Sequence, residues 1–260
     1  LRFPEGWLHP QAAQIPQSEG RLDVVGGSFS GERFYVKRVT PLPFSHVLAN
    51  ETFGCLCADS GLGNSWWKNA YFGRVTGWCN DIAKGPSGEK MLLRTKAGVY
   101  DLCNGSLASF SPENARYEGT AGEIAFRLEV AVAPDCGKKE LTLWLENTGD
   151  MQEETAAAYF LEPVMGTFRE QAKYIHLEQE GDCLILFNPY QAELHFYAAV
   201  YTPGDYPTYA TDKQAFYSGD WSAGTLGCHA DPAVGVVLKK SLPPHGETMF
   251  RFVLACADSR

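Results

Sequence analysis

The sequence of 260 residues has almost no helical periodicity and no apolar run near the roughly 18 residues that a membrane-spanning helix needs. It shows no secretory signal peptide, and it begins at Leu1 rather than Met, so we expect a fragment of a longer polypeptide. The 31 acidic residues outnumber the 22 basic ones, which gives a net charge of −9. This charge argues against a nucleic-acid partner, because phosphate binding depends largely on Lys and Arg.

Several motifs of known chemistry are also missing. Gly61-Leu-Gly63 lacks the third glycine and the following helix of a dinucleotide-binding loop, and no G-x-S-x-G is present. The eight cysteines contain no C-x-x-C, and the six histidines lack metal-ligand spacing. We therefore expect no metal ion and no cofactor. We also expect reduced, partly buried thiols, as in a cytoplasmic protein.

Strand patterns dominate what is present. Apolar residues alternate with polar ones over residues 123–132 and again at Leu141, Leu143 and Leu145, which predicts a β-hairpin with one solvated face. Residues 248–256 alternate as well, and the continuous apolar runs at 183–187 and 234–238 predict strands buried on both faces. Helical turns are expected only at residues 212–217 and 168–173.

Many strands with so few helices predict an all-β fold, a large antiparallel sandwich. Residues 1–20, which contain Pro4, Pro10 and Pro16, are expected to form a lead-in segment. No linker rich in Pro, Gly or Ser divides the remainder. Residues 21–260 are therefore expected to form a single domain.

Tryptophans, amides and charged residues gather between residues 60 and 81. Flat apolar rings mixed with amides, carboxylates and a guanidinium suit a sugar, which offers a C–H face and a rim of hydroxyl groups. The residues predicted to bind substrate are Trp66, Trp67, Asn69, Arg74, Trp78, Asn80 and Asp81. The alternative is that the tryptophans only fill the core, since most tryptophans are largely buried.

His176 and His195 allow a different hypothesis. They lie in adjacent strand-like segments with Glu178 and Glu193 nearby, and two histidines with a glutamate could open and close a sugar ring by general acid–base catalysis. The competing interpretation is that both histidines are polar-face residues of a hairpin. No motif places either histidine against a carboxylate.

The run from Pro41 to Asp81 resembles the N-terminal domain of glycoside hydrolase family 94, the former glycosyltransferase family 36. The family comprises cellobiose, chitobiose and β-1,2-glucan phosphorylases and the phosphorylase-like part of cyclic β-1,2-glucan synthases. The segments that carry the resemblance are Pro41-Leu-Pro-Phe44, Val47-Leu-Ala-Asn50, Phe53-Gly54, Gly61-Leu-Gly-Asn-Ser-Trp66, Asn69-Ala-Tyr71 and Val75-Thr-Gly-Trp-Cys-Asn-Asp81. Later segments in the expected order are Gly85-Pro-Ser-Gly-Glu89, Leu92-Leu-Arg94, Asn188-Pro-Tyr190, Asp212 to Gly219, Cys228-His-Ala-Asp-Pro232 and Pro244-His-Gly-Glu247.

The sequence also departs from the family pattern. The family's Asn-Ser-Arg is Asn69-Ala-Tyr71 here, the proline before Trp78 is Gly77, and a Gly-Arg pair is Gly219-Asp220. The two missing arginines put in doubt any contact that they make in relatives.

The resemblance implies a β-supersandwich similar to galactose mutarotase. In the family this domain precedes a helical linker and an α/α barrel, which carries the general-acid aspartate and the phosphate site of an inverting phosphorylase or glycosyltransferase. The chain itself is then not catalytic, and its implied partners are a β-linked glucan or oligosaccharide and the downstream α/α barrel, with a homodimer also allowed. Its location would be cytoplasmic, or the cytoplasmic part of a membrane-associated synthase. The alternatives are a freestanding aldose epimerase, a carbohydrate-binding module and a purely structural dimerisation domain.

Overall fold

Strand pairing follows the alternation in the sequence. The computed structural model describes residues 6–17, 20–36, 43–77 and 88–260. In it, β13 (Ile124–Val132) pairs with β14 (Lys138–Asn147) in antiparallel register from Ile124 opposite Asn147 to Val132 opposite Lys139. Phe126 and Leu128 point into the core and Arg127 points to solvent. The predicted hairpin is confirmed.

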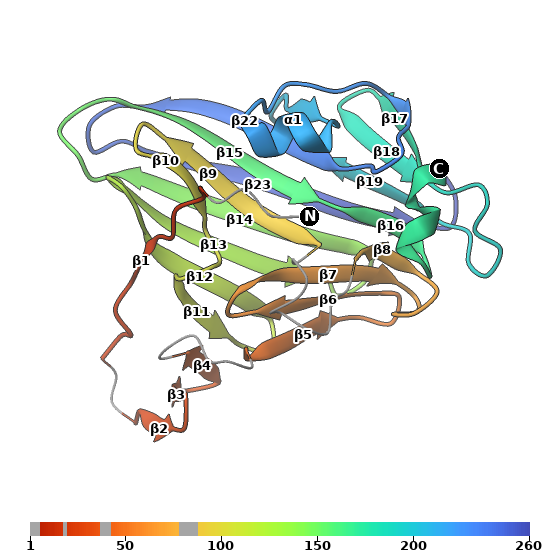
Figure 1. Cartoon of the computed structure of the whole chain (residues 1–260). Helices are drawn as coiled ribbons and strands as arrows, with labels where there is room; N and C mark the ends of the chain where they lie inside the picture. The colour runs from red at the N-terminus through yellow and green to blue at the C-terminus, as the bar shows by residue number, and fades with distance from the viewer. Residues whose placement is uncertain (1–5, 18–19, 37–42, 78–87) are drawn as a thin grey trace.

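This hairpin lies in the middle of a sheet of 13 described strands, called the large sheet below (Figure 1). In spatial order its strands are β2 (Leu22–Val24), β3 (Gly27–Ser30), β4 (Arg33–Val36), β11 (Leu107–Phe110), β12 (Asn114–Ala121), β13, β14, β23 (Glu247–Ala257), β19 (Tyr197–Tyr201), β18 (Cys183–Phe187), β17 (His176–Glu180) and β21 (Gly227–Cys228). The remaining strand, β1 (Gln11–Ala12), pairs with β12. The strands predicted over 183–187 and 248–256 are β18 and β23.

Two sheets of five described strands each pack on the inner face of the large sheet. The second sheet has the order β10 (Gly98–Asp101), β9 (Glu89–Thr95), β15 (Glu153–Leu161), β22 (Val234–Leu242) and β20 (Thr208–Ala210). The third sheet has the order β16 (Pro163–Gly166), β8 (Arg74–Thr76), β7 (Gly61–Trp67), β6 (Phe53–Ala58) and β5 (Ser45–Ala49). Every strand pair in these sheets is antiparallel, so the predicted all-β antiparallel supersandwich is confirmed.

One hydrophobic core fills the space between the three sheets. Tyr159 of β15 and Phe252 of β23 meet there with ring centroids 6.3 Å apart, and Phe53 of the third sheet is fully buried in the same cluster. Cys55 and Cys57 lie buried in β6, and all seven cysteines that the structure describes are free thiols.

The two helical segments lie where short helical turns were predicted. The α1 helix (Lys213–Ser218) begins after Asp212, whose Oδ1 accepts a hydrogen bond from the Ala215 amide at 2.8 Å, and it ends at Gly219 in the left-handed region. It covers the outer face of the second sheet, where Phe216 stacks on Phe160 with centroids 4.4 Å apart (Figure 1). The other segment is the 3-10 helix η1 (Arg169–Tyr174). Among the described residues, no helix has the length and apolar character needed to cross a membrane.

A buried ion pair joins all three sheets inside the core. Lys139 of β14 donates to Glu89 Oε2 of β9 at 2.6 Å, and both side chains are fully buried. The Tyr159 hydroxyl donates to the same oxygen at 2.5 Å, while the hydroxyl groups of Ser65 and Thr76, from the third sheet, donate to Oε1 at 2.6 and 2.8 Å. The carboxylate is thereby surrounded by four donors from the three sheets.

The two charges stabilise each other's ionised form. Burial, the largest single influence, would raise the pKa of the Glu89 carboxyl, but the charge of Lys139 and the hydrogen bonds from Lys139, Ser65 and Tyr159 together hold this pKa below its usual value. Burial would likewise lower the pKa of Lys139, yet the charge of Glu89, the neighbouring Cys55 and Cys57, and the hydrogen bond to Glu89 together raise it above the ordinary lysine value.

Candidate functional site

Four of the seven predicted binding residues lie in the part of the chain that the structure describes. Trp66 and Trp67 end strand β7, Asn69 lies in the turn that follows, and Arg74 begins β8. Trp78, Asn80 and Asp81 lie outside the described residues, and their role stays a prediction.

Trp67 has a packing role in the structure. Its side chain is 6% exposed, and its indole Nε1 donates to Asp258 Oδ1 at 3.0 Å. Lys68 Nζ bonds the same carboxylate, at 2.6 Å from Oδ2, so Lys68 first and Trp67 second hold the pKa of Asp258 below its usual value. Gly137 lies flat against the ring, because a Cβ at Gly137 would come within 2.3 Å of it. Trp67 thus fastens the end of β23 to the end of β7.

The neighbouring residues shape the turn between β7 and β8. Trp66 is half-buried over Gly54, where an added Cβ would come within 2.3 Å of its indole. Asn69 Oδ1 accepts hydrogen bonds from the amides of Tyr71 and Phe72 at 2.8 and 3.0 Å, which closes the turn. The turn therefore presents two aromatic rings to solvent.

These rings belong to a larger group, which we call the aromatic end surface. Its members are all 40% exposed or more: Tyr71 at 50%, Phe72 at 40%, Phe168 at 55%, Tyr174 at 40% and Tyr190 at 70%. Such exposure is unusual for large rings gathered in one place and is typical of binding surfaces. The sequence signals that could have revealed them are a Tyr-Phe pair inside a polar turn and a tyrosine directly after Asn188-Pro189.

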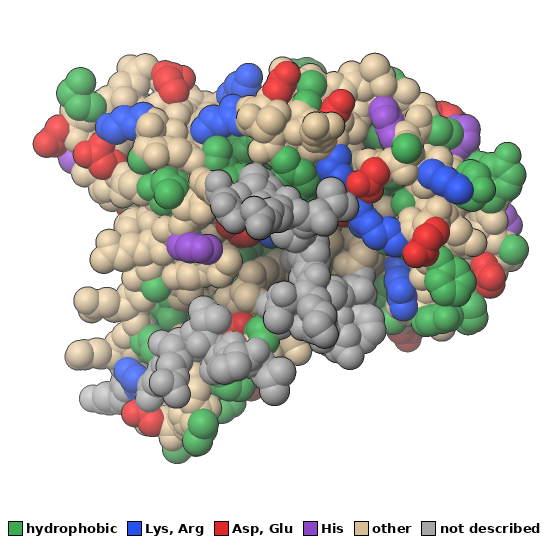
Figure 2. All heavy atoms as spheres, viewed as in Figure 1, with side chains coloured by type: hydrophobic (Ala, Val, Ile, Leu, Met, Phe, Trp, Pro, Cys, Tyr) green, Lys and Arg blue, Asp and Glu red, His purple; other side chains and the backbone are tan. Residues whose placement is uncertain are grey.

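Contacts between the segments make this surface continuous. Arg74 Nη1 donates to the carbonyl oxygen of Thr167 at 3.1 Å, and Gln191 Nε2 donates to that of Phe72 at 3.1 Å. The rings of Tyr174 and Tyr190 lie 5.0 Å apart. Hydrophobic side chains accordingly gather at the right-hand edge of Figure 2, where Figure 1 shows η1 and the ends of β8 and β16.

Cations lie against two of the exposed rings. The guanidinium of Arg74 lies 5.1 Å from the ring centroid of Tyr71, and Lys173 Nζ lies 5.1 Å from that of Tyr174. Exposed rings with adjacent donors can cover the C–H face of a sugar and bond its hydroxyl groups, or they can form the centre of a protein interface.

A polar cluster lies next to this surface and centres on Glu162, whose side chain is 5% exposed. Its carboxylate accepts hydrogen bonds from Arg169 at 2.5 Å, from Lys213 at 2.8 Å and from the Tyr217 hydroxyl at 2.8 Å. Arg169 and Lys213 also bond Asp231, each at 3.0 Å. Burial first, and the negative charge of Glu162 second, raise the pKa of Tyr217.

The Glu162 cluster adjoins Gly77 and Gly88. The amide of Gly77 donates to the Glu162 carbonyl oxygen at 3.3 Å, and the amide of Glu162 donates to that of Gly88 at 2.8 Å. These two glycines are the last described residue before 78–87 and the first one after it. The segments around residues 75, 162, 169, 213 and 231, far apart in the sequence, thus meet at one place.

Glu162→Gln tests the cohesion of this cluster. The amide removes the negative charge that two cations share, and we expect the free energy of unfolding to fall by about 1.5–3 kcal/mol, the range for hydrogen bonds to charged groups. Urea denaturation of the variant measures it. A matched exposed change, Glu170→Gln, should alter stability by less than about 0.5 kcal/mol. Equal stability of both variants would contradict the structural importance of the cluster.

The two histidines do not lie in adjacent strands. His176 is in β17 and stacks on Phe187 of β18 with centroids 5.1 Å apart. His195 lies in the connection between β18 and β19, so β18 separates the two segments. The described residues also contain no group of three or more His, Cys, Asp or Glu side chains that could hold a metal ion.

A family model and a named protein both match this chain in sequence. A family model described as "Glycosyl hydrolase 94, supersandwich domain" matches residues 32–260. The cyclic beta-(1,2)-glucan synthase NdvB of Rhizobium meliloti (strain 1021) is 23% identical, and the match covers 74% of this chain and 7% of the synthase. The chain thus spans a small part of the length of this relative.

Solved structures share the fold. A bacterial glucoamylase complexed with acarbose matches 98% of this chain and 35% of its own with a TM-score of 0.53 at 11% identity. A galactose mutarotase related enzyme from Lactobacillus acidophilus matches 82% of this chain and 97% of its own with a TM-score of 0.51 at 9% identity. At such identities the likeness concerns the fold alone, and it confirms the predicted mutarotase-like supersandwich.

Proposed function

Because the chain belongs to the glycosyl hydrolase 94 supersandwich family, we propose that it is the carbohydrate-recognition and assembly domain of a glucan phosphorylase or a cyclic β-1,2-glucan synthase. Residues 21–260 act as a single domain that supplies no catalytic group. The catalytic groups lie in an α/α barrel of the same polypeptide, on the cytoplasmic side. The domain shapes the substrate entrance and holds the barrel in place.

The observation that carries this proposal is the aromatic end surface. Five exposed rings and two cations at one end of a sandwich form a surface that a saccharide or a neighbouring domain can cover. The predicted residues Trp78, Asn80 and Asp81 follow Gly77, which bonds Glu162 beside this surface. We therefore keep these three residues, with Trp66, Asn69 and Arg74, as the proposed contacts at the active-site entrance.

The Glu162 cluster supports a positioning role in this proposal. Glu162 accepts hydrogen bonds from Arg169, Lys213 and the Tyr217 hydroxyl, and the same two cations also bond Asp231. Charged groups shared in this way hold the segments around residues 162, 169, 213 and 231 together beside the aromatic end surface.

The test is a pair of substitutions in the full polypeptide. Tyr71→Ser with Phe72→Ser removes two exposed rings at the tip of the β7–β8 turn and leaves the core unchanged. We expect kcat/KM for β-glucan turnover to fall at least tenfold, or about 1.4 kcal/mol, while the melting temperature changes by no more than a few degrees. Trp78→Ala should act in the same direction.

The matched control is Tyr206→Ser. Tyr206 is 87% exposed and follows β19, whereas Tyr190 of the aromatic end surface precedes that strand. We expect turnover in this variant to equal that of the wild type. Unchanged turnover in the Tyr71 and Phe72 variant would refute the proposal, and so would a loss that is matched by unfolding.

A further inference from the structure

A hollow of about 320 Å³ lies on the outward face of the large sheet, away from the core. Its lining comes from the four neighbouring strands β12, β13, β14 and β23. The polar and aromatic side chains that form its walls are Glu118, Arg127, Trp144, Glu146, Glu247 and Thr248, and Ala125, Phe126 and Leu145 complete the lining. Trp144 lies seven residues along β14 from Gly137, which contacts Trp67, and this corresponds to about 23 Å of strand. The hollow is therefore separate from the aromatic end surface.

Strand register explains why this part of the sheet is hollow. Glu118, Arg127 and Trp144 are direct cross-strand partners and form one outward row. In the next row Ala125 pairs with Glu146, and Glu146 pairs with Glu247. Ala125 is the small member of these two rows, so the longer side chains around it form walls above a low floor.

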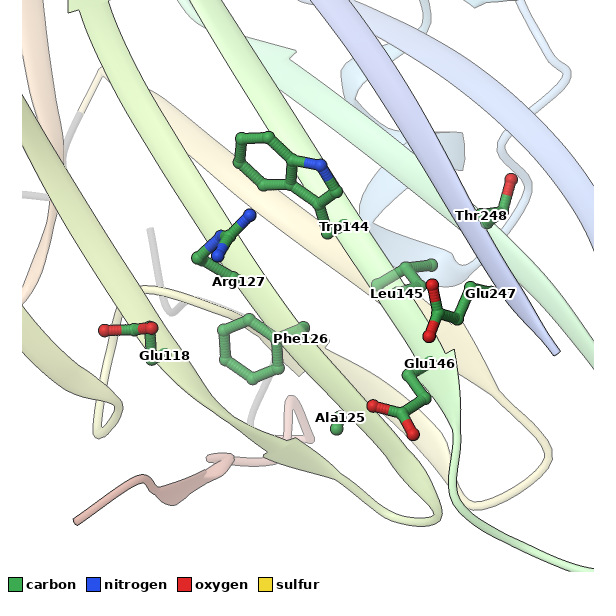
Figure 3. A pocket seen from close by; sticks show the side chains of 9 residues that line it. All are labelled: Glu118, Ala125, Phe126, Arg127, Trp144, Leu145, Glu146, Glu247 and Thr248. Atoms are coloured by element: carbon green, nitrogen blue, oxygen red, sulfur yellow. The ribbon is translucent and has the colours of Figure 1, made fainter. Parts of the chain in front are cut away.

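Arg127 faces Trp144 rather than a carboxylate. Its guanidinium lies 4.1 Å from the indole centroid, although Glu118 is its direct cross-strand partner on the other side (Figure 3). Among the described residues, the side chains of Glu118, Glu146 and Glu247 have neither a hydrogen-bond partner nor an ion-pair partner. Arg116 and Glu129 lie on the same two strands, two residues away from Glu118 and Arg127, and they form an ion pair at 2.8 Å. The pairing seen next to the hollow is thus absent within it.

We propose that this hollow binds a short neutral oligosaccharide, as a second saccharide site independent of the aromatic end surface. The Trp144 indole and the Arg127 guanidinium form an apolar and cationic wall for the C–H face and ring oxygens of a sugar. The glutamates around the floor accept hydrogen bonds from its hydroxyl groups. The volume is at the lower end of the range for small-molecule sites, which fits one or two sugar rings.

The charge and spacing of the lining select this ligand class. Three carboxylates against one guanidinium leave an excess of two negative charges, which disfavours a phosphate or a uronic acid. Figure 3 shows Glu118 on one side of Arg127, and Glu146 and Glu247 on the other. Acceptors spread around a floor suit several hydroxyl groups of a sugar ring better than a single ion.

Titration of the chain with β-1,2-linked glucose disaccharide and tetrasaccharide tests the site, with the indole N–H signals of the six tryptophans followed by nuclear magnetic resonance. Trp144→Phe identifies the Trp144 signal. We expect this signal to shift saturably with a Kd in the millimolar range or below. Glu146→Gln with Glu247→Gln should raise that Kd at least fivefold, and both positions are exposed, so the fold is retained.

The control Glu170→Gln with Glu193→Gln changes the net charge equally at exposed positions elsewhere, and it should leave the Kd unchanged. A Trp144 signal that does not move overturns the proposal, and so does equal weakening by both pairs of substitutions. If the Trp66 signal moves and that of Trp144 does not, the second site is refuted while recognition at the aromatic end surface is supported. Turnover by the full polypeptide tests the proposed function separately.

Discussion

Lys139→Met is expected to lower the free energy of unfolding by about 3–5 kcal/mol, as measured by urea denaturation at neutral pH. Methionine fills a similar volume but leaves the Glu89 carboxylate buried without the cation that lies 2.6 Å from it. The hydroxyl groups of Ser65, Thr76 and Tyr159 still donate to the carboxylate, yet they do not neutralise its charge. The loss follows from an uncompensated buried charge and not from a cavity.

The pH dependence separates these two causes. In the wild type the pKa of Glu89 is lowered, so its stabilisation is present above the unfolded value of 4.5 and is lost only as the pH falls through the folded pKa. In Lys139→Met the cation that opposes burial is gone and only the hydroxyl donors remain, so burial, the largest influence, raises that pKa and the folded state takes up a proton more readily. The free energy of unfolding that the variant loses relative to the wild type should therefore be smaller at pH 5 than at pH 8.

The double variant Glu89→Leu with Lys139→Met is the control. It removes both charges, so it should recover part of the lost stability and abolish the difference between pH 5 and pH 8. Recovery should be incomplete, because three hydroxyl groups lose their acceptor. A single variant within 1 kcal/mol of the wild type, with no change in pH dependence, would show that the pair contributes little.

Trp67→Ala is expected to cost about 3–5 kcal/mol of stability, the range for truncating a large buried aromatic side chain. The ring packs against Gly137, and its Nε1 bonds Asp258, so the substitution removes both packing and a link between β7 and β23. Trp67→Phe keeps much of the ring and should cost about 1 kcal/mol, through the lost hydrogen bond and some packing.

Trp66→Ala serves as the comparison for this prediction. Trp66 is only half-buried, and we expect its truncation to cost less stability than that of Trp67. If Trp67→Ala unfolds at the same urea concentration as the wild type, then Trp67 is not a packing residue. Its first interpretation, as a sugar contact, would then regain support.

Period-2 alternation predicted the strands well, because one face of each strand is buried and the other is not. It identified β13, β14 and β23, and the continuous apolar runs identified β18 and β22, of which residues 234–238 are fully buried. Asp212, which caps α1, lies at the start of the helical turn that the sequence predicted. Local patterns sufficed for these elements because local burial decides them.

The polar features of the interior depend on partners that no local pattern reveals. Lys139 follows Lys138 in what reads as a solvated turn, yet it is buried in β14 because its partner, Glu89, is 50 residues away in the sequence. The Glu162 cluster likewise depends on residues 169, 213 and 231, which meet only in the folded chain. Among the predicted site residues, the neighbouring Trp66 and Trp67 look alike in the sequence, which could not show that the ring of Trp67 is the one that is buried.

The bonds from Asp258 to Trp67 and Lys68 have a mechanical consequence. Arg260 pairs with Glu178 of β17, at the end of the sandwich where η1 lies (Figure 1), so any stretch of polypeptide continuing past it would leave from beside β17. A force transmitted along that stretch would load the Arg260 pair first and the Asp258 bonds next, and through Asp258 it would reach the hairpin tip that carries Tyr71 and Phe72. The orientation of whatever follows and the shape of this tip would then change together.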